Sequence, residues 1–390
     1  MSKIDELIQE LCPDGVKWKQ LGDICVSLRK GTLKRGQLVD DGAYPVINSG
    51  REWYGFYDSY NNEADALIIA ARGEYAGFVS YISTKFWAGG LCYPYRSIKD
   101  DVIQTKFIYY YLKNNEQSIM DTLVARGSIP AINKSDVDKI QIPLPPLPIQ
   151  EEIVRILDKF TKLEAELEAE LEARKKQYDY YRNQLLTPKE IDGKWFMNGK
   201  EVEWKTLDQV SLNISAGGDL PKKHNKGQSG PSSEFPYPIY SNGKDSNALY
   251  GYTDSYRIDK EAVTISARGT IGFHTIRKPF FTPIVRLITM IPNSKLISSK
   301  YLNYALDITC IGSSGGSIPQ LTVPNVRILK IPIPPLSEQE RIVSILDRFD
   351  ALVNDISIGL PAEIEARRKQ YEYYRGKLLS FKNIADRAEA

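Results

Sequence analysis

Arginines beside glycines recur at matching places in the two halves of this chain. Arg72 lies in an Ala-Arg-Gly tripeptide after a short apolar run, and Arg268 lies in the same tripeptide later in the chain. Arginine can donate two parallel hydrogen bonds to guanine or to a phosphate, and a neighbouring glycine lets the backbone approach a duplex. Both arginines are candidates for nucleic-acid contacts, with an ion pair inside the fold as the alternative.

Two glycine-containing loops with clustered cations form a second matching pair. The first loop covers residues 29–35, and its counterpart covers residues 217–226. Such clusters suit contacts with successive phosphates, although most charge runs are simply solvated surface. The residues that we expect to contact DNA in these loops are Lys30, Thr32, Lys34, Arg35, Lys222, Lys223 and Lys226.

Two asparagines, two serines and one arginine are the remaining candidates for contacts with DNA. Asn48 and Asn242 each stand beside a serine and near a glycine in a third shared loop, and asparagine can pair with adenine. An ordinary turn explains these asparagines equally well. Ser128 in the first half and Ser317 in the second belong to Gly-Ser-Ile-Pro segments that suit phosphate contacts, and Arg126 directly precedes the first of them. A tight turn before the last strand is the alternative there.

The sequence contains no arrangement that indicates catalysis or a bound metal. The four cysteines are scattered and only two histidines occur, so no zinc-ligand spacing is present. No Gly-x-x-x-x-Gly-Lys-Ser/Thr loop occurs, and neither Pro-Pro pair follows the Asn or Asp of an adenine-methyltransferase signature. We expect no catalytic residue, no metal and no cofactor in this chain; an enzyme with an unrecognised active site is one alternative.

The net charge of +2 conceals an uneven distribution. Residues 188–335 contain 18 Lys and Arg against 12 Asp and Glu, whereas residues 1–147 contain 17 against 18. A phosphate-binding surface must therefore be local, and the second half shows it better. The N-terminal residues lack the apolar stretch of a signal peptide, and no run of about eighteen apolar residues occurs. We expect a cytoplasmic protein that does not contact a membrane.

An internal repeat organises these candidates. Residues 142–160 match residues 331–349 at one constant offset, and residues 172–182 reappear as 365–375. The intervening segments are related only faintly. Strong similarity in some parts and weak similarity in others indicates one scaffold that carries two different recognition surfaces.

The strongly repeated segments have helical periodicity. Apolar residues recur mostly three or four positions apart in residues 148–187 and again in residues 336–386. Ser337 and Glu340 have the spacing of a capping box at the start of the second helix. Gly359-Leu360-Pro361 predicts a break, because proline cannot continue the hydrogen-bond ladder. The two helices should pack antiparallel, since each must bury its apolar seam.

The weakly repeated segments, residues 1–147 and 188–335, have the pattern of globular domains. Residues 66–71 and 262–267 are short, apolar candidates for buried strands, and glycine-rich turns surround them. The predicted fold class is α+β: two globular domains of mixed helix and strand, joined by two long antiparallel helices in a coiled coil, with a pseudo-twofold repeat.

The ordered set of motifs resembles the specificity subunits of type I restriction-modification systems. The motif Ile-Pro-x-Pro-Pro-Leu-x-x-Gln-Glu enters each long helix, and Glu-Ala-Arg-x-Lys-Gln-Tyr-x-Tyr-Tyr-Arg leaves it. The resemblance spans essentially the whole chain. It implies a non-catalytic, DNA-binding subunit whose two target-recognition domains each recognise one half of a bipartite, asymmetric site, while the helices fix the spacing.

The resemblance also implies partners. Two modification subunits that methylate adenine with S-adenosylmethionine, and a restriction subunit that cuts unmodified DNA, would join this chain on double-stranded DNA. The candidates for holding the modification subunits are Tyr180, Arg182, Tyr373 and Arg375, with packing in the helical seam as the alternative. A coiled-coil adaptor whose domains bind protein and not DNA is the rival function.

Overall fold

The computed structural model describes residues 3–309, 321–355 and 357–387. The chain divides into two compact units, which share the long helix α6 (Leu147–Leu186). The first unit combines Met1–Glu168 with Glu363–Ala390, and the second unit is Ala169–Ala362. Each unit therefore contains one globular part together with helical segments from distant parts of the sequence.

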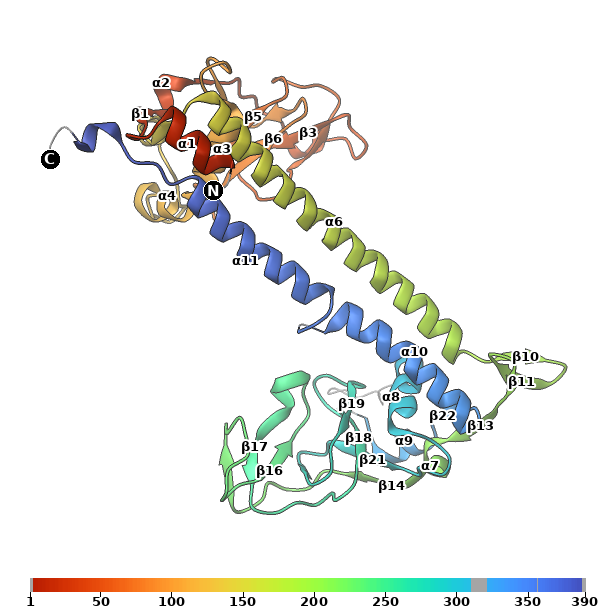
Figure 1. Ribbon diagram of the computed structural model, residues 1–390. Helices are drawn as coiled ribbons and strands as arrows, with labels where there is room; N and C mark the ends of the chain where they lie inside the picture. Colours follow the sequence, from red (N-terminus) through yellow and green to blue (C-terminus); the bar gives the residue numbers. More distant parts are fainter. Residues whose placement is uncertain (1–2, 310–320, 356, 388–390) are drawn as a thin grey trace. The chain divides into compact units, whose positions relative to one another are not determined.

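Two sheets and a strand pair build the globular part of the first unit (Figure 1). The four-stranded antiparallel sheet has the order β2 (Cys25–Ser27), β8 (Cys92–Ser97), β5 (Ala66–Ala70) and β6 (Val79–Ile82). The three-stranded sheet has the order β4 (Gly55–Tyr57), β3 (Tyr44–Ile47) and β7 (Trp87–Ala88). Strand β1 (Lys17–Gln20) pairs with β9 (Gln141–Leu144). Every residue of β5 is buried, which confirms the strand predicted from its apolar run.

Short helices complete the first unit. α3 carries Phe107, Ile108 and Leu112 into the core formed with β5. The helices of this part are α1 (Lys3–Leu11), α2 (Leu21–Ile24), α3 (Thr105–Asn114), α4 (Glu116–Leu123), α5 (Lys134–Asp138), and the 3₁₀ helices η1 (Arg35–Gln37) and η3 (Ile384–Arg387).

The second unit repeats this topology. Its main sheet has the order β14 (Ser211–Ala216), β21 (Ile288–Pro292), β18 (Ala262–Ile265) and β19 (His274–Arg277). Its other sheet has the order β15 (His224–Lys226), β17 (Leu249–Thr253), β16 (Tyr237–Tyr240) and β20 (Thr282–Pro283). Strand β13 (Glu203–Thr206) pairs with β22 (Lys330–Ile333). The β16–β20 pair is parallel, as is β3–β7, so the faint sequence repeat is a repeat of the main strand topology, with β15 as an added strand in the second unit.

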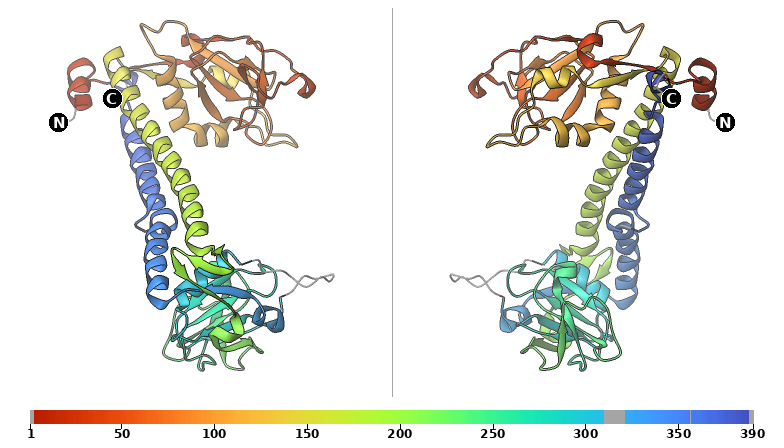
Figure 2. Two further views of the ribbon diagram at one scale, coloured as in Figure 1. Left: turned by 90° about the vertical axis from the view of Figure 1, so that its right-hand side faces the viewer. Right: turned by 90° about the vertical axis from the view of Figure 1, so that its left-hand side faces the viewer.

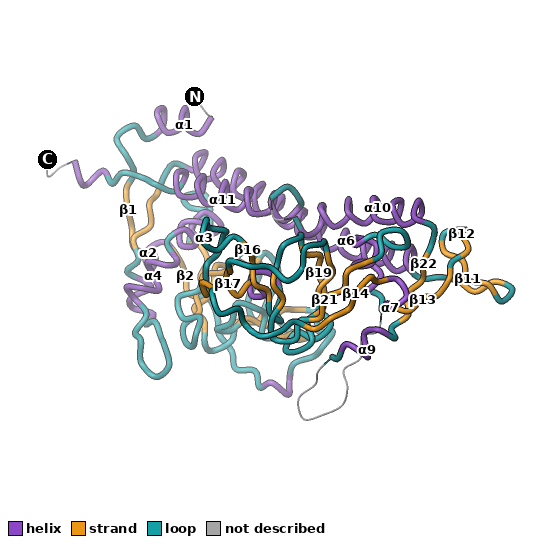
Figure 3. The backbone as a smooth tube through the Cα atoms, turned by 90° about the horizontal axis from the view of Figure 1, so that it is seen from below, coloured by secondary structure: helices purple, strands orange, loops and turns teal. Residues whose placement is uncertain are grey.

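The second unit also has elements of its own. A three-stranded sheet of β10 (Lys189–Ile191), β11 (Lys194–Met197) and β12 (Lys200–Glu201) follows α6 and lies at the same end of the unit as β13 and β22 (Figure 3). The short helices are α7 (Leu207–Val210), α8 (Ser299–Asp307), α9 (Val323–Arg327) and η2 (Asp245–Ala248). The α+β class predicted from the sequence is confirmed.

Within the first unit, α6 runs antiparallel to α11 (Leu360–Leu378), and the two helices lie side by side (Figure 2). The ring of Phe160 stacks on Tyr374 with centroids 5.7 Å apart, while Glu164 and Glu168, further along α6, accept hydrogen bonds from Arg368. Within the second unit, Tyr181 of α6 stacks on Phe349 of α10 (Leu336–Asn354) at 5.6 Å. The N-terminal part of α6 therefore packs against α11 in the first unit, and its C-terminal part packs against α10 in the second unit.

The second helical segment is interrupted between α10 and α11. The backbone N–H of Gly359 donates to the carbonyl of Asp355, and the Asp355 carboxylate accepts from the N–H of Ser357 at 2.7 Å. A Cβ atom at Gly359 would come within 2.8 Å of three carbonyl oxygens, so a side chain does not fit there. Pro361 stands in the first turn of α11, where its missing N–H costs no helical hydrogen bond.

The predicted capping box is wrong. The N-cap position of α10 is Pro335, and no side chain caps this end, so Ser337 already lies inside the helix. The helix begins earlier because proline before the first turn fixes an extended backbone. Among the described residues, no helix has both the length and the apolarity that a membrane span requires.

Candidate nucleic-acid interface

In the first unit, the turn at residues 89–91, between β7 and β8, connects several candidate segments. The Lys30 ammonium donates to the carbonyl of Gly90 at 3.3 Å. The N–H of Leu91 donates to Oδ1 of Asn48 at 2.8 Å, and the Leu91 carbonyl accepts from Ala71 N–H at 2.9 Å. One turn therefore gathers the basic loop, the asparagine loop and the segment that carries Arg72.

The Gly-Ser-Ile-Pro segment joins the same surface. Arg72 forms an isolated antiparallel bridge with Ala131, and the N–H of Gly73 donates to the Pro130 carbonyl at 2.9 Å. Arg72, Arg126 and Ser128 are all exposed. We call the loop 29–35, Asn48, the turn 89–91, and the segments 71–73 and 125–132 the first recognition surface.

Two cations of this surface have contacts within the unit. The Lys30 ammonium lies 4.9 Å from the centroid of the Tyr93 ring, whose hydroxyl donates to the Ile132 carbonyl at 3.2 Å. The Arg126 guanidinium pairs with Asp121 at 2.9 Å, where both side chains are exposed and the pair is weak. Both cations are exposed, so their charges stay accessible to an anionic ligand.

The rest of the first basic loop is exposed to solvent. Thr32, Lys34 and Arg35 are exposed, and the Gln37 side chain accepts from the Lys34 backbone N–H at 2.9 Å to start η1. This geometry is consistent with phosphate contacts and equally with solvated surface.

In the second unit, the side chain of Asn242 joins two segments. Its Oδ1 accepts from the N–H of Ala267, and its Nδ2 donates to the carbonyl of Val285, both at 2.7 Å. Ala267 precedes Arg268, which is exposed, and Val285 belongs to the turn between β20 and β21. The same three segments meet in the first unit through different hydrogen bonds, because Asn48 accepts from Leu91 and the Ala71 N–H donates to the Leu91 carbonyl.

The start of the second basic loop is bonded to the same turn. Gly217 donates to the carbonyl of Leu287 at 2.8 Å and accepts from the N–H of Arg286 at 3.1 Å. Gly218 donates to Pro283 and accepts from Val285 in the same way. We call the loop 217–226, Asn242, the segment 267–268 and the turn 284–287 the second recognition surface.

The lysines of the second basic loop stand on and beside β15, an edge strand. Lys226 lies 5.6 Å from the Tyr250 ring centroid, and Lys223 is 3.9 Å from a carboxylate oxygen of Asp254. Lys222, like these two, is exposed. The predicted candidate Ser317 lies outside the described residues, so the counterpart of Ser128 has no position here.

The structure gives the two asparagines a positioning role. Both polar groups of the Asn242 amide are engaged by backbone, and Oδ1 of Asn48 is engaged as well. A two-bond contact with adenine would require these bonds to be exchanged. The geometry therefore favours the alternative that the sequence left open, an ordered turn.

Sequence reasoning missed the central turns. Gly89-Gly90 is a recognisable turn signal in the first unit. In the second unit the corresponding residues are Ile284, Val285 and Arg286, and the first two are β-branched residues that favour a strand when considered by themselves. Only the long-range hydrogen bonds identify this segment as part of the candidate site.

The helical candidates separate into two kinds. Tyr180 and Tyr373 are 57% and 66% exposed, and each packs edge-on against the next tyrosine with centroids 5.4 Å apart and an interplanar angle of 74°. Arg182 is 5.4 Å from the Tyr178 ring centroid and Arg375 is 5.2 Å from that of Tyr371. The tyrosines offer free surface, whereas the arginines are partly buried within the chain.

Arg375 also connects α11 with the globular part of the first unit, because its Nε donates to Oδ1 of Asn114 at the end of α3. Arg182 pairs with Asp179 at 3.0 Å. These contacts favour packing within each unit over direct contact with a partner for both arginines.

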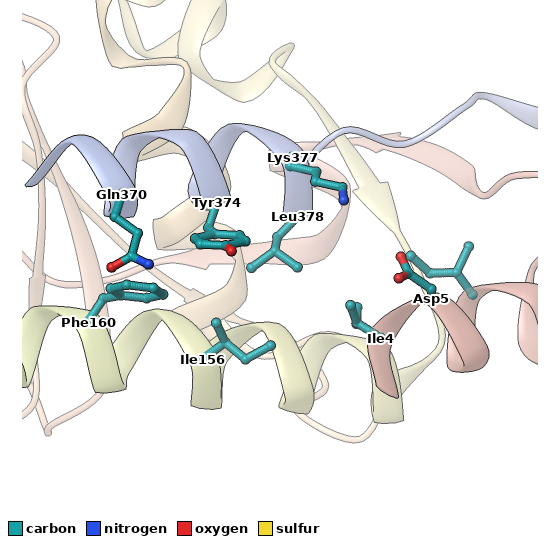
Figure 4. A pocket seen from close by; sticks show the side chains of 9 residues that line it. Ile4, Asp5, Ile156, Phe160, Gln370, Tyr374, Lys377 and Leu378 are labelled. Atoms are coloured by element: carbon teal, nitrogen blue, oxygen red, sulfur yellow. The ribbon is translucent and has the colours of Figure 1, made fainter. Parts of the chain in front are cut away.

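A cavity of about 340 Å³ lies in the helical part of the first unit, among α1, α6 and α11. Ile4, Ile156, Phe160, Tyr374 and Leu378 face it, as Figure 4 shows, and the lining is mainly apolar. The cavity belongs to the scaffold and is lined by none of the residues of the first recognition surface.

Two buried thiols of the first unit are poorly reactive. Burial raises the pKa of the Cys25 and Cys92 thiols to about 12, so both remain protonated and poorly nucleophilic. Among the described residues, no group of three or more His, Cys, Asp or Glu side chains could hold a metal ion. The arrangement can bind and position an anionic polymer by exposed cations on a rigid frame.

Comparison with known proteins shows the family to which this chain is similar. Residues 13–173 and 200–366 match the model of the type I restriction modification DNA specificity domain. The chain is 32% identical over 419 residues to the type I restriction enzyme EcoR124I/EcoR124II specificity subunit of Escherichia coli, with 98% of each chain covered. It is 30% identical over 372 residues to the putative type I specificity subunit S.MpnORF507P of Mycoplasma pneumoniae, covering 94% of this chain and 98% of the relative.

The fold has a solved counterpart. The crystal structure of the type I restriction-modification system S subunit from M. genitalium superposes with a TM-score of 0.63 at 20% identity. The similarity covers 94% of this chain and 96% of that chain.

Proposed function

The chain belongs to the type I restriction-modification DNA specificity family, and from that membership we propose that its two recognition surfaces are where it contacts double-stranded DNA. One observation carries the proposal. In both units the same set of segments, a basic loop, an asparagine loop, an arginine segment and a central turn, is joined by hydrogen bonds on the same strand topology.

The two surfaces share a frame but differ in their exposed side chains. Gly90 and Leu91 of the first surface stand where Val285 and Arg286 stand in the second. A shared strand topology with different exposed side chains is what the recognition of two unlike half-sites requires, because the base edges are read by individual side chains. The central turns also differ in backbone, since Val285 and Arg286 have positive φ whereas Gly90 and Leu91 do not. Each unit would thus read one half of an asymmetric site.

The candidate cations would fix the protein on the backbone of the duplex. They are the exposed members of the basic loops, namely Lys30, Lys34, Arg35, Lys222, Lys223 and Lys226, together with Arg72, Arg126 and Arg268. Contacts with phosphate supply affinity and depend steeply on salt, whereas they carry no sequence information themselves.

The chain itself would be the non-catalytic reader of a larger complex. Two modification subunits, which would bind S-adenosylmethionine and methylate adenine, are proposed to attach to the helices, and a restriction subunit to join them. Tyr180 and Tyr373 support this attachment because they present matching exposed aromatic surfaces in the two units. Exposed tyrosines are frequent anchors at protein interfaces.

Exchange of one domain tests the reading of half-sites. Residues 188–335 would be replaced by the corresponding segment of a relative with a different target, and methylated adenines would be mapped for the assembled complex. We expect one half of the site to change and the other half to stay the same. A change in both halves together would contradict independent reading by the two units.

Substitution of the exposed tyrosines tests the partner surface. The double variant Tyr180→Ala and Tyr373→Ala should weaken binding of the modification subunit by about tenfold or more, as the loss of interface anchors does. Glu372→Ala, an exposed neighbour on α11, is the matched control and should bind as the wild type does. Equal affinity of the double variant and the wild type would exclude these tyrosines as anchors.

A further inference from the structure

The turn between β20 and β21 has an unusual backbone. Its central residues, Val285 and Arg286, have φ of 52° and 60°, and the N–H of Leu287 donates to the carbonyl of Ile284 at 3.1 Å to close it. Positive φ at both central positions marks turns of the I′ class, which Asn, Asp and Gly dominate. A β-branched residue there is strained, because its side chain crowds the backbone.

The surrounding structure imposes this conformation. The N–H groups of Val285 and Arg286 donate to the carbonyls of Gly218 and Gly217, and the Val285 carbonyl accepts from the Asn242 side chain. Strained residues persist only where neighbouring contacts fix them, and they cluster at functional sites. The turn is therefore rigid and its peptide N–H groups are already used, so it cannot bind a phosphate through them.

The side chains of the turn remain available. Arg286 is exposed, and the Val285 side chain is 53% exposed beside it. Asn242 connects this turn directly to Ala267, the neighbour of Arg268. The turn of the first unit has Gly90 and Leu91 at the corresponding place and carries no charge, although Lys30 reaches over it from the basic loop.

We infer that Arg286 is a specificity-determining residue that contacts the edge of a guanine in the half-site read by the second unit, an inference that rests on the proposed function. A rigid turn places one side chain accurately, and accuracy is what a two-bond contact from a guanidinium to guanine demands. A phosphate contact needs no such accuracy. Backbone hydrogen bonds of the turn with Gly218, Gly217 and the Asn242 side chain keep it in its conformation.

The experiment uses the chain assembled with its modification subunits. Binding would be measured to the preferred site and to duplexes with each base pair of the second half-site substituted, for the wild type, Arg286→Ala and Arg286→Lys. We expect Arg286→Ala to lose about 10- to 100-fold of the discrimination at one G·C pair, with unchanged preference elsewhere. Arg286→Lys should lose less of the discrimination at the same pair, because a lysine ammonium can also bond guanine but lacks the planar fork of arginine.

Lys194→Ala removes an exposed cation from β11 and is the matched control, which should retain every preference. An equal loss of affinity for all sequences in Arg286→Ala, rescued by Arg286→Lys, would show a phosphate contact and overturn the inference. Unchanged discrimination in both variants would also overturn it. A wild-type complex that prefers no sequence would instead refute the proposed function itself.

Discussion

The side-chain amide of Asn242 joins two segments of the second recognition surface. Asn242→Ala should lower the free energy of unfolding by about 1–3 kcal/mol, because it removes the partner of the buried Ala267 N–H and that of the Val285 carbonyl. Discrimination in the second half-site should fall with it. The measurement is urea unfolding of the purified chain together with binding to half-site variants.

Asn213→Ala, at an exposed position on β14, is the control for Asn242→Ala and should change little. A variant of Asn242 that kept full stability but lost preference for a single adenine would show that the asparagine reads a base directly.

The positive φ of Val285 should cost the folded chain stability. Val285→Gly should raise the free energy of unfolding by about 1 kcal/mol, since relief of about 1–3 kcal/mol of backbone strain exceeds the extra entropy of glycine in the unfolded chain. Urea titration of the purified chain measures it. The matched control is Val26→Gly in strand β2, also exposed, which should be destabilising. Similar losses in both variants would show that the turn is not strained.

At the scale of the element, the first turns of α6 depend on a buried carboxylate. Hydrogen bonds from Arg155, and then from Lys3, lower the pKa of Glu152 to about 2, from an ordinary value of 4.5. In this interval the folded state binds fewer protons than the unfolded state. The stabilisation is therefore complete above about pH 4.5 and is lost as the pH falls towards 2.

Glu152→Gln should consequently reduce the dependence of stability on pH between about 4.5 and 2, because glutamine does not titrate. Urea midpoints at several pH values across this interval measure the slope. Glu151→Gln, an exposed neighbour, should leave the wild-type slope unchanged. Equal slopes for Glu152→Gln and the wild type would contradict the assignment.

At the scale of the whole molecule, α6 passes from one unit into the other within a duplicated tetrapeptide. Residues 165–168 and 169–172 are both Ala-Glu-Leu-Glu, and the units divide between Glu168 and Ala169. A third copy would lengthen the helix by about 6 Å and rotate the residues beyond it by about 40° past a full turn. We expect the two half-site sequences to stay unchanged while the gap between them grows.

The geometry of DNA sets the size of that change. Rotation argues for one added base pair, since the duplex turns by about 34° per pair, whereas length alone argues for nearly two at about 3.4 Å each. A misrotated reader would face phosphate instead of a groove, so one pair is expected, with two if length governs. Mapping methylated adenines for the insertion variant measures the gap, and an unaltered gap would exclude α6 as the spacer.

The repeat, the periodic helices, the buried strand at Ala66–Ala70 and the family could all be predicted from the amino-acid sequence. These features are local or occur twice in the chain, so their residue spacing carries them. The candidate cations could also be assigned to loops, because the same loops recur in both halves of the sequence. In the structure these loops are hydrogen-bonded to the central turns.

Which segments meet, and which contacts the candidate side chains make within the chain, could be seen only in the folded structure. The roles of Asn48 and Asn242, the packing of Arg182 and Arg375, and the turn of Arg286 all depend on contacts that no local pattern encodes. The backbone of Val285 is the clearest example. Its own preference is for a strand, whereas hydrogen bonds with the distant Gly218 and Asn242 hold it in a turn.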